Sequence, residues 1–451
     1  MYVATAIVNV GIIAVDDYTM AIAPIIPAQN HSVAQIINDA GFRSAVPTLI
    51  LFSLSRLALN LGLNDPANQF RFVLVILGVA SFLIQATFGA KQFKETEQKK
   101  IFVFLIGFYF ACPLFFTRPM IEALSAPFIT VSAYCARGYW ESPKKAPLAL
   151  ATIFLAIASL FRFQVGVCVL ALIAVVLLRK RHRDLPWLVL VGATCFVVSG
   201  LIDWRLRGSF HYSLLSYLKY NLALSSTFGT TPFYSFALLF LGLSFPPVLF
   251  RRFPGFEWKK EYGQLLPTLI YFVAFVISHS LVPHKEERFM IPVLPLFLVL
   301  LTPMVEHLLR KGFFQWRVAY FVVLNFLLLG LASFNIAQKN VVGLAIYLQQ
   351  HPHIDSIFSV EDTLLYLFPT AFISRKVEHR GVKSSELDKL RPTCRQAVAL
   401  RSDYNTPQLN TQFKQLAAFS PGILEWIVVK LNPGQNSRRA AVELWVSKDC
   451  P

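Results

Sequence analysis

A short run of ionisable residues lies between two long apolar stretches in the second half of the chain. The run consists of His284, Lys285, Glu286, Glu287 and Arg288. A His, a Lys and an Arg held together can bind a phosphate or diphosphate through charge-assisted hydrogen bonds. The two glutamates can orient these cations. The alternative interpretation is a polar turn that neutralises its own charge, and the pattern alone weighs the two evenly.

A pair of carboxylates, Asp16 and Asp17, directly follows the first apolar stretch, residues 2–15. Carboxylates this close to hydrocarbon are costly, and this cost favours a functional role. The structural alternative is that they cap and charge-match a helix that starts near Thr19. The residues alone slightly favour the cap.

Two more features are candidates for ligand contacts. Arg118 follows Thr117 in a tight turn between apolar stretches, where the simpler explanation is an arginine that snorkels from a helix end. The loop from Asp203 to Tyr234 gathers small, hydroxylated and aromatic residues, among them Gly229 and Thr230. Such a composition suits a sugar, which binds by stacking and hydrogen bonds, although an interfacial aromatic belt explains it as well.

The elements that must position these residues are membrane-spanning helices. Of the 451 residues, 55% are hydrophobic and only 15% are charged, whereas a soluble domain carries about 25% charged residues. This composition excludes a soluble globular domain. We expect eleven spans, at 2–15, 70–90, 101–117, 121–136, 147–161, 163–178, 187–203, 233–250, 264–282, 289–308 and 317–335. The short pair around Arg162 has the alternative of broken helices that dip into the membrane.

The positive charge of the chain follows from its topology. The formal net charge is +17, and the excess lies in five short basic loops that alternate with less basic connections, as the positive-inside rule requires of cytoplasmic loops. A nucleic-acid partner is therefore not expected. Loops 16–69, 204–232 and 283–288 and the tail then lie on the non-cytoplasmic side. All the candidate residues above face this side.

The tail, residues 337–451, is polar and contains strand-like segments at 356–360 and 441–446. This pattern predicts that the tail forms a small α+β domain outside the membrane, separate from a helical domain of residues 1–336. Cys394 and Cys450 lie in this tail and can form a disulfide in an oxidising compartment. No cysteine or histidine spacing indicates a metal site.

The segment HKEERFMIPVLPL, residues 284–296, resembles the hallmark motif of glycosyltransferase family 22, the dolichyl-phosphate-mannose-dependent mannosyltransferases of N-glycan and GPI-anchor assembly. Weaker pieces follow the family's order: Asp16-Asp17 with Pro24, Gly41-Phe42-Arg43-Ser44, Thr117-Arg118, the stretch from Asp203 to Gly208, and the run from Phe228 to Tyr234. This chain departs from the family at Thr231, where the family has a His. The acidic residue that often follows the family's Ser/Thr-Arg turn is shifted, and Glu122 is the nearest candidate.

The resemblance implies an all-α polytopic membrane protein of the GT-C fold. It implies an inverting transfer of a mannosyl residue from a polyprenyl phosphate to a glycan or glycolipid acceptor at the outer membrane face, with no cofactor and no metal. Asp16 would be the general base, with Asp17 beside it. Candidates for the donor phosphate are His284, Lys285, Arg288, Arg118 and Arg162. Candidates for substrate contacts are Glu286, Glu287, Arg43, Gly229, Thr230 and Tyr234.

Three other functions share these features. One is the transfer of another sugar from a polyprenyl phosphate, and the second is transfer to a protein acceptor. The third, from a different class, is a lipid or sugar transporter or flippase, which should show paired repeats with broken helices. The loose motifs and compact length favour a bacterial inner membrane, and the sequon at Asn30 keeps the endoplasmic reticulum as the alternative.

Overall fold

The computed structural model of the protein describes residues 1–14, 18–23, 32–39, 41, 43–224, 229–245, 253, 255–311, 315–364, 367–390, 393–404 and 409–450. The chain forms two compact units. The first comprises Met1–Val3, Ala40–Leu49 and Val75–Ala332, and the second Ala4–Asp39, Ile50–Leu74 and Ser333–Pro451. The domain boundary predicted at residue 336 remains a prediction.

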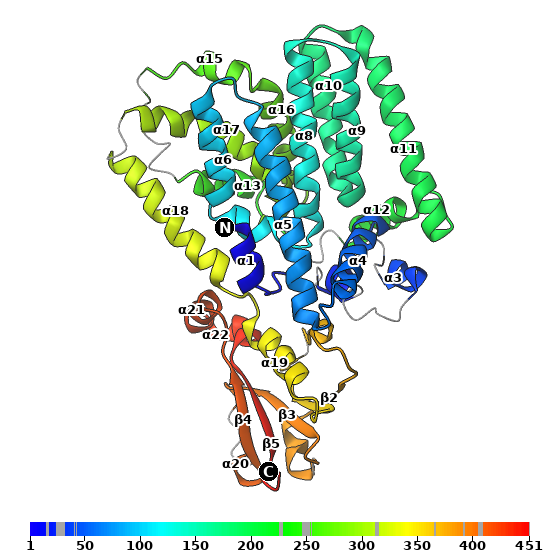
Figure 1. Ribbon diagram of the computed structural model, residues 1–451, viewed down its shortest axis with the longest axis vertical. Helices are drawn as coiled ribbons and strands as arrows, with labels where there is room; N and C mark the ends of the chain where they lie inside the picture. The colour runs from blue at the N-terminus through cyan, green and yellow to red at the C-terminus, as the bar shows by residue number, and fades with distance from the viewer. Residues whose placement is uncertain are drawn as a thin grey trace. The chain divides into compact units, whose positions relative to one another are not determined.

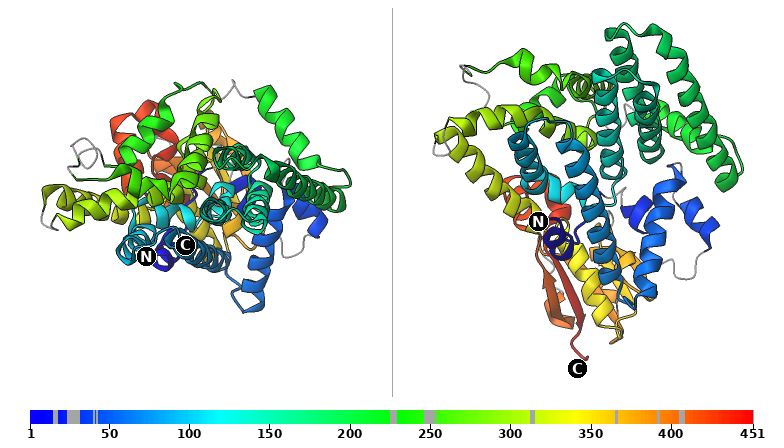
Figure 2. Two further views of the ribbon diagram at one scale, coloured as in Figure 1. Left: turned by 90° about the horizontal axis from the view of Figure 1, so that it is seen from above. Right: turned by 45° about the horizontal axis from the view of Figure 1, so that its top comes forward.

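The first unit is helical. Its elements, some of which continue into the second unit, are α1 (Tyr2–Val8), α4 (Ala45–Asn60), α5 (Pro66–Ala90), α6 (Thr96–Phe108), α7 (Ala111–Phe116), α8 (Ile121–Glu141), α9 (Lys145–Phe161), η3 (Phe163–Cys168), α10 (Val169–Leu178), η4 (His182–Asp184), α11 (Leu185–Arg207), α12 (Tyr212–Leu224), α13 (Ser235–Leu243), α15 (Trp258–Gly263), α16 (Leu266–Ser280), η5 (Glu287–Val293), α17 (Leu294–Arg310) and α18 (Trp316–Phe334). Helices α8, α9 and α10 stand side by side (Figure 1). Helix α11 lies along α9 at the edge of this group (Figure 2).

Four helical stretches of the described chain are long and apolar enough to cross a membrane, at Pro66–Ala90, His182–Arg207, Glu287–Arg310 and Trp316–Gln350. Shorter apolar helices lie at Ala45–Asn60, Lys145–Phe161, Phe163–Leu178 and Leu266–Ser280. A polytopic, mostly helical architecture is therefore confirmed. The count of eleven spans is not.

The predicted first span is wrong in its extent, because α1 ends at Val8. The Asn9 side chain accepts a hydrogen bond from Gly11 N at 3.1 Å and donates one to Asn335 O at 3.0 Å. Ile12 N then donates to Ala337 O at 3.2 Å. The polar groups after α1 therefore find partners at residues 335–337 instead of in a longer helix, as buried backbone groups must.

The predicted span 101–117 is two helices, because the chain breaks between α6 and α7. Asn325 on α18 satisfies the exposed backbone: its Oδ1 accepts from Phe110 N at 2.9 Å and its Nδ2 donates to Phe108 O at 2.8 Å. A buried helix end needs such partners. The break at Arg162, by contrast, lies where the sequence predicted it, between α9 and η3.

The second unit contains the α+β part of the chain. Its helices include η1 (Tyr18–Ile22), α3 (Val33–Asp39), α19 (Lys339–Gln350), η6 (Thr370–Phe372), η7 (Ser384–Lys389), α20 (Leu409–Gln412), α21 (Ile423–Leu431), α22 (Pro433–Asn436) and η8 (Ser437–Arg439). Its strands are β1 (Ser356–Val360), β2 (Glu378–Val382), β3 (Gln396–Arg401), β4 (Phe413–Phe419) and β5 (Val442–Ser447), in the sheet order β2-β1-β3-β5-β4. The strands predicted at 356–360 and 441–446 are therefore confirmed.

Pairing in this sheet is mixed. Strand β1 pairs in parallel with β2 and β3, and β5 pairs antiparallel with β3 and β4. Val360, Val398, Leu400 and Phe413 are buried members of its core. Strand β1 reads SIFSV, and four of its five residues are buried while Phe358 is half-buried, so both faces of this strand are covered.

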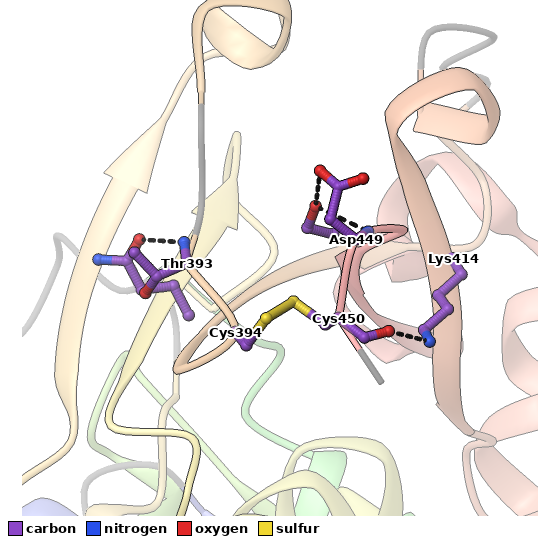
Figure 3. Close-up of a disulfide and its surroundings, with 7 residues drawn as sticks. Thr393, Cys394, Lys414, Asp449 and Cys450 are labelled. Atoms are coloured by element: carbon purple, nitrogen blue, oxygen red, sulfur yellow. Dashed lines mark hydrogen bonds between the residues drawn. A yellow bond between two sulfur atoms is a disulfide. The ribbon is translucent and has the colours of Figure 1, made fainter.

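A disulfide joins Cys394, just before β3, to Cys450, after β5 (Figure 3). The two Cα atoms lie 5.3 Å apart, within the usual range for a disulfide. The pairing that the sequence left conditional on an oxidising compartment is therefore present. Disulfides persist in secreted, lumenal and periplasmic settings and are rare in the cytosol.

Candidate active site

Glu286 organises the ionisable run before α17. Its Oε1 lies 3.0 Å from His284 Nε2, and its Oε2 accepts a hydrogen bond from Arg288 Nε at 2.6 Å. Glu286 thus holds two of the predicted cations, as both interpretations of the sequence require. Glu287 is exposed and begins η5.

Lys285 turns away from Glu286 and binds a neighbouring loop. Its Nζ donates to Thr231 O at 2.9 Å, and Thr231 N donates to Pro283 O at 3.0 Å. These bonds fasten the segment with Gly229, Thr230 and Tyr234 to the ionisable run. Gly229 has φ +88°, which favours glycine at this position. Gly229, Thr230 and Tyr234 are all exposed.

Arg162 forms a buried ion pair with Glu122. The two side chains are only 2% and 4% exposed, and Arg162 Nη1 donates to Glu122 Oε1. Arg162 occupies the extended residue between α9 and η3, and Glu122 lies in the first turn of α8. Among the described residues, Arg162 Nε and Nη2 and Glu122 Oε2 have no hydrogen-bond partner.

The hydrogen-bonding groups of this pair that have no partner among the described residues lower the stability of the fold. A buried ion pair is stable only if its remaining donors and acceptors are satisfied, and each unsatisfied buried polar group costs about 1–3 kcal/mol. Unpartnered groups of this kind call for an explanation, such as a catalytic role or a ligand.

Phe289 connects the buried pair with the ionisable run. The Arg162 guanidinium carbon lies 5.0 Å from the centroid of the Phe289 ring, and that of Arg288 lies 5.8 Å from it. Two predicted phosphate-binding arginines, far apart in the sequence, therefore both contact one aromatic ring. Cation–π contacts at these distances hold guanidinium groups in place.

Tyr217 on α12 interacts electrostatically with both members of the pair. Burial raises the pKa of Tyr217, and Arg162, Glu122 and Arg43 also act on it electrostatically. Gln164 Nε2 donates to the Tyr217 hydroxyl. Arg43 and Arg162 therefore both act on the Tyr217 hydroxyl, and the substrate contact predicted for Arg43 stays a prediction.

The Gly41-to-Ser44 segment is also held by a residue of the Asp203-to-Gly208 motif. Arg207 Nη1 donates to Gly41 O at 2.6 Å, and Arg207 Nη2 donates to Arg43 O at 2.9 Å. Asp203 itself accepts from Ser213 N at 2.7 Å and fixes the start of α12. Two motifs that looked weak in the sequence thus support each other in space.

His279 is a further candidate residue that the sequence analysis did not name. It lies on α16 with only 7% of its surface exposed, and Arg162 interacts with it electrostatically. Its Nδ1 is 2.9 Å from Phe275 O, while its Nε2 has no hydrogen-bond partner among the described residues. The signal available in the sequence was an ionisable residue inside an apolar segment, which is a functional candidate by default.

The remaining predicted residues are placed as follows. Arg118 is buried, 2% exposed, in the turn between α7 and α8. Asp16 and Asp17 lie outside the described residues. Tyr18, directly after them, is held within the second unit, where its hydroxyl accepts from Ala371 N at 2.8 Å.

The arrangement suits an anionic ligand. Arg162 offers two N–H donors without partners among the described residues, and the Arg288 guanidinium carbon lies 5.8 Å from the centroid of the same Phe289 ring. Guanidinium groups bind phosphate with fixed fork geometry, and preorganised donors stabilise charge that develops on a leaving oxygen. Within the described chain, no group of three or more His, Cys, Asp or Glu side chains could hold a metal ion.

Solved structures share the fold. The crystal structure of ArnT from Cupriavidus metallidurans bound to undecaprenyl phosphate aligns with 100% of this chain and 96% of its own, at a TM-score of 0.54 and 11% identity. The apo form of the same protein aligns with the same TM-score. This likeness confirms the predicted GT-C fold.

The Alg9-like mannosyltransferase family matches residues 38–360 of the chain. The chain belongs to this family. It is 24% identical over 337 residues to GPI mannosyltransferase 3 of Yarrowia lipolytica, covering 70% of this chain and 62% of that relative. It is 31% identical over 158 residues to GPI alpha-1,2-mannosyltransferase 3 of Mus musculus, covering 34% of this chain and 26% of that protein. The chain thus spans less than two thirds of the relatives' length.

Proposed function

We propose that the chain is an inverting mannosyltransferase that moves mannose from a polyprenyl phosphate to a glycolipid acceptor. The observation that carries the proposal is the family match over residues 38–360, which contains the buried Arg162–Glu122 pair and the ionisable run. Arg162, His284, Lys285 and Arg288 supply positive charge for a single phosphate. The undecaprenyl phosphate bound by ArnT supports a lipid phosphate as the ligand.

In the proposed reaction, the acceptor hydroxyl attacks the anomeric carbon of the donor. The bond between that carbon and the phosphate oxygen breaks as the new glycosidic bond forms on the opposite face. Asp16 takes the hydroxyl proton, and Asp17 orients it. The polyprenyl phosphate leaves with its negative charge on oxygen, where Arg162 and Arg288 stabilise it. Arg118 is a further contact for the phosphate.

Acceptor contacts are proposed at the loop beside the ionisable run. Gly229, Thr230 and Tyr234 are exposed there, and Arg43 lies near Tyr217. Glu286 orients His284 and Arg288, and Glu287 is exposed to the substrate. The names of the relatives support a GPI-type glycolipid as the acceptor.

We propose the endoplasmic reticulum membrane as the location, with the active site and the tail on the lumenal side. The named curated relatives are eukaryotic, which favours this alternative over the bacterial inner membrane that the sequence suggested. The disulfide between Cys394 and Cys450 also requires an oxidising side.

The test is an assay of the purified chain in nanodiscs with radiolabelled polyprenyl-phosphate mannose and a panel of glycolipid, glycan and peptide acceptors. Wild type should transfer label to a glycolipid. Asp16→Asn should bind the donor and transfer nothing, because it lacks the base. Retained transfer by this variant would refute Asp16 as the base, and donors with other sugars distinguish the related transferases.

A further inference from the structure

Helix α21 of the second unit exposes apolar residues along most of its length. It reads ILEWIVVKL, and none of its residues is buried. Ile423 is 64% exposed, Ile427 41% and Leu431 80%, and four-residue spacing places these three on one helix face. Leu424, at 40% exposed, adjoins them. A contiguous exposed apolar face of this kind marks an interaction site.

The opposite face of α21 is attached to the protein. Glu425 and Val429, four residues apart, are half-buried. The carboxylate of Glu425 accepts from Gln338 N at 2.9 Å. The helix is therefore held in one orientation, and its apolar face is turned outward.

The place of attachment is the end of α18, which corresponds to the last predicted span, residues 317–335. Helix α18 ends at Phe334, and the side chain of the next residue, Asn335, accepts from Leu424 N at 3.1 Å. Gly422 packs so closely that a Cβ there would lie 2.5 Å from Asn335 Oδ1 and 2.8 Å from Ile336 O. The start of α21 is thus fixed against the residues where the chain leaves a span.

The edge of the apolar face has the chemistry of a membrane surface. Trp426 is 53% exposed, and the Lys430 ammonium lies 5.3 Å from the centroid of its ring. Arg438 and Arg439 follow in η8, which contacts α21. Tryptophan and basic residues gather at the level of lipid headgroups, and interfacial helices combine these with an apolar face.

We propose that α21 lies in the interface of the bilayer, with Ile423, Ile427 and Leu431 among the lipid chains and Lys430 at the phosphate level. The occupant of the apolar face is the lipid surface. The helix anchors the tail at the level where lipid-linked substrates present their headgroups. This inference does not rest on the proposed reaction.

The experiment uses the full chain in nanodiscs of neutral and anionic phospholipids that contain a phospholipid with a diazirine near its headgroup. After irradiation, lipid adducts are mapped by mass spectrometry. Segment 423–431 should carry at least five times as many adducts as the segment around Leu416 on β4, which at 39% is about as exposed as Ile427. Equal labelling of the two segments would overturn the proposal.

A variant pair sharpens the comparison. Ile427→Glu with Leu431→Glu should lower the adducts on α21 at least fivefold and leave those on α18 unchanged. The control is Leu416→Glu, which places a glutamate at an exposed apolar position of the same unit and should change neither. An intact Cys394–Cys450 disulfide reports the fold of each variant. Unchanged labelling of α21 in the double variant would contradict the proposal.

Discussion

At the scale of single residues, the site depends on groups whose hydrogen-bonding capacity the protein leaves unused. The Arg162–Glu122 pair keeps two donors and one acceptor without partners among the described residues. This is an unstable arrangement for a purely structural pair. A ligand phosphate would satisfy the donors and explain why the pair is buried.

We predict that Arg162→Lys lowers the rate of mannose transfer at least tenfold while the protein remains folded. Lysine keeps the charge opposite Glu122 but loses the planar fork. A lost hydrogen bond to a charged group is worth roughly 1.5–3 kcal/mol, which corresponds to about a tenfold change or more in rate. Steady-state transfer and thermal unfolding are measured together. Exposed Arg205→Lys is the control, and an unchanged rate in Arg162→Lys would refute the role.

His279 gives a second test. His279→Phe preserves the stacking on Phe275, whose ring centroid lies 3.9 Å away, and removes only the ring nitrogens. If Nε2 contacts the substrate, transfer falls by roughly tenfold with little change in thermal stability. If the residue serves only in packing, the rate stays at the wild-type value. Initial rates at saturating donor separate the two outcomes.

Sequence reasoning found the members of this site unevenly, for a physical reason. The ionisable run is local, so its residues were visible together, and Glu286 indeed contacts His284 and Arg288. The approach of Arg162 to Glu122 and Phe289 depends on tertiary packing, which no local pattern contains. His279 was missed because a lone histidine in an apolar segment also fits a core.

At the scale of elements, interruptions between helices determine where the residues of the candidate site lie. Arg162 sits where α9 gives way to η3, and the sequence predicted this break from two short apolar runs. The break after α6 was missed, because Asn325 on a distant helix satisfies its backbone. The first span was misjudged for the same reason, since residues 335–337 replace its later helical turns.

The segment η1 links the acidic pair to the tail. We predict that Tyr18→Phe lowers the maximal rate of transfer several-fold and leaves the donor KM unchanged. The substitution removes the acceptor for the buried Ala371 N–H, at a cost of about 1–3 kcal/mol, and loosens the segment that follows Asp17. Transfer kinetics and thermal unfolding are measured for each protein.

The control for this prediction is Tyr404→Phe. It removes a hydrogen bond to Asp362 within the same unit, 2.5 Å long, but on a loop beside β3. Burial raises the pKa of Tyr404 to about 12, so the hydroxyl is protonated at neutral pH. A comparable loss of rate in both variants would show that stability, and not the position of the acidic pair, is responsible.

At the scale of the whole molecule, the proposed function depends on which side of the membrane carries the ionisable run and the tail. The positive-inside pattern predicts that the ionisable run and the tail lie on the non-cytoplasmic side. The disulfide independently requires an oxidising side for the tail. Sequence predicted the membrane class from composition, whereas the number of spans could not be fixed because several apolar runs are broken or short.

We predict that Cys394 and Cys450 are oxidised in cells. Free thiols are blocked in intact cells before lysis, and the blocked and oxidised cysteines are then distinguished by mass spectrometry. One disulfide between these two residues is expected, with the buried Cys112, Cys135 and Cys168 reduced. Free thiols at both tail positions would place the tail in a reducing compartment and contradict the lumenal orientation.

The central claim is that the protein cleaves a polyprenyl-phosphate mannose and keeps the sugar for an acceptor. The most direct measurement is a single-turnover reaction in nanodiscs with a donor labelled differently in mannose and phosphate. We predict one polyprenyl phosphate released for each mannose found on the glycolipid acceptor. A donor that stays intact, or that crosses the bilayer of a proteoliposome unchanged, would contradict the account and favour a flippase.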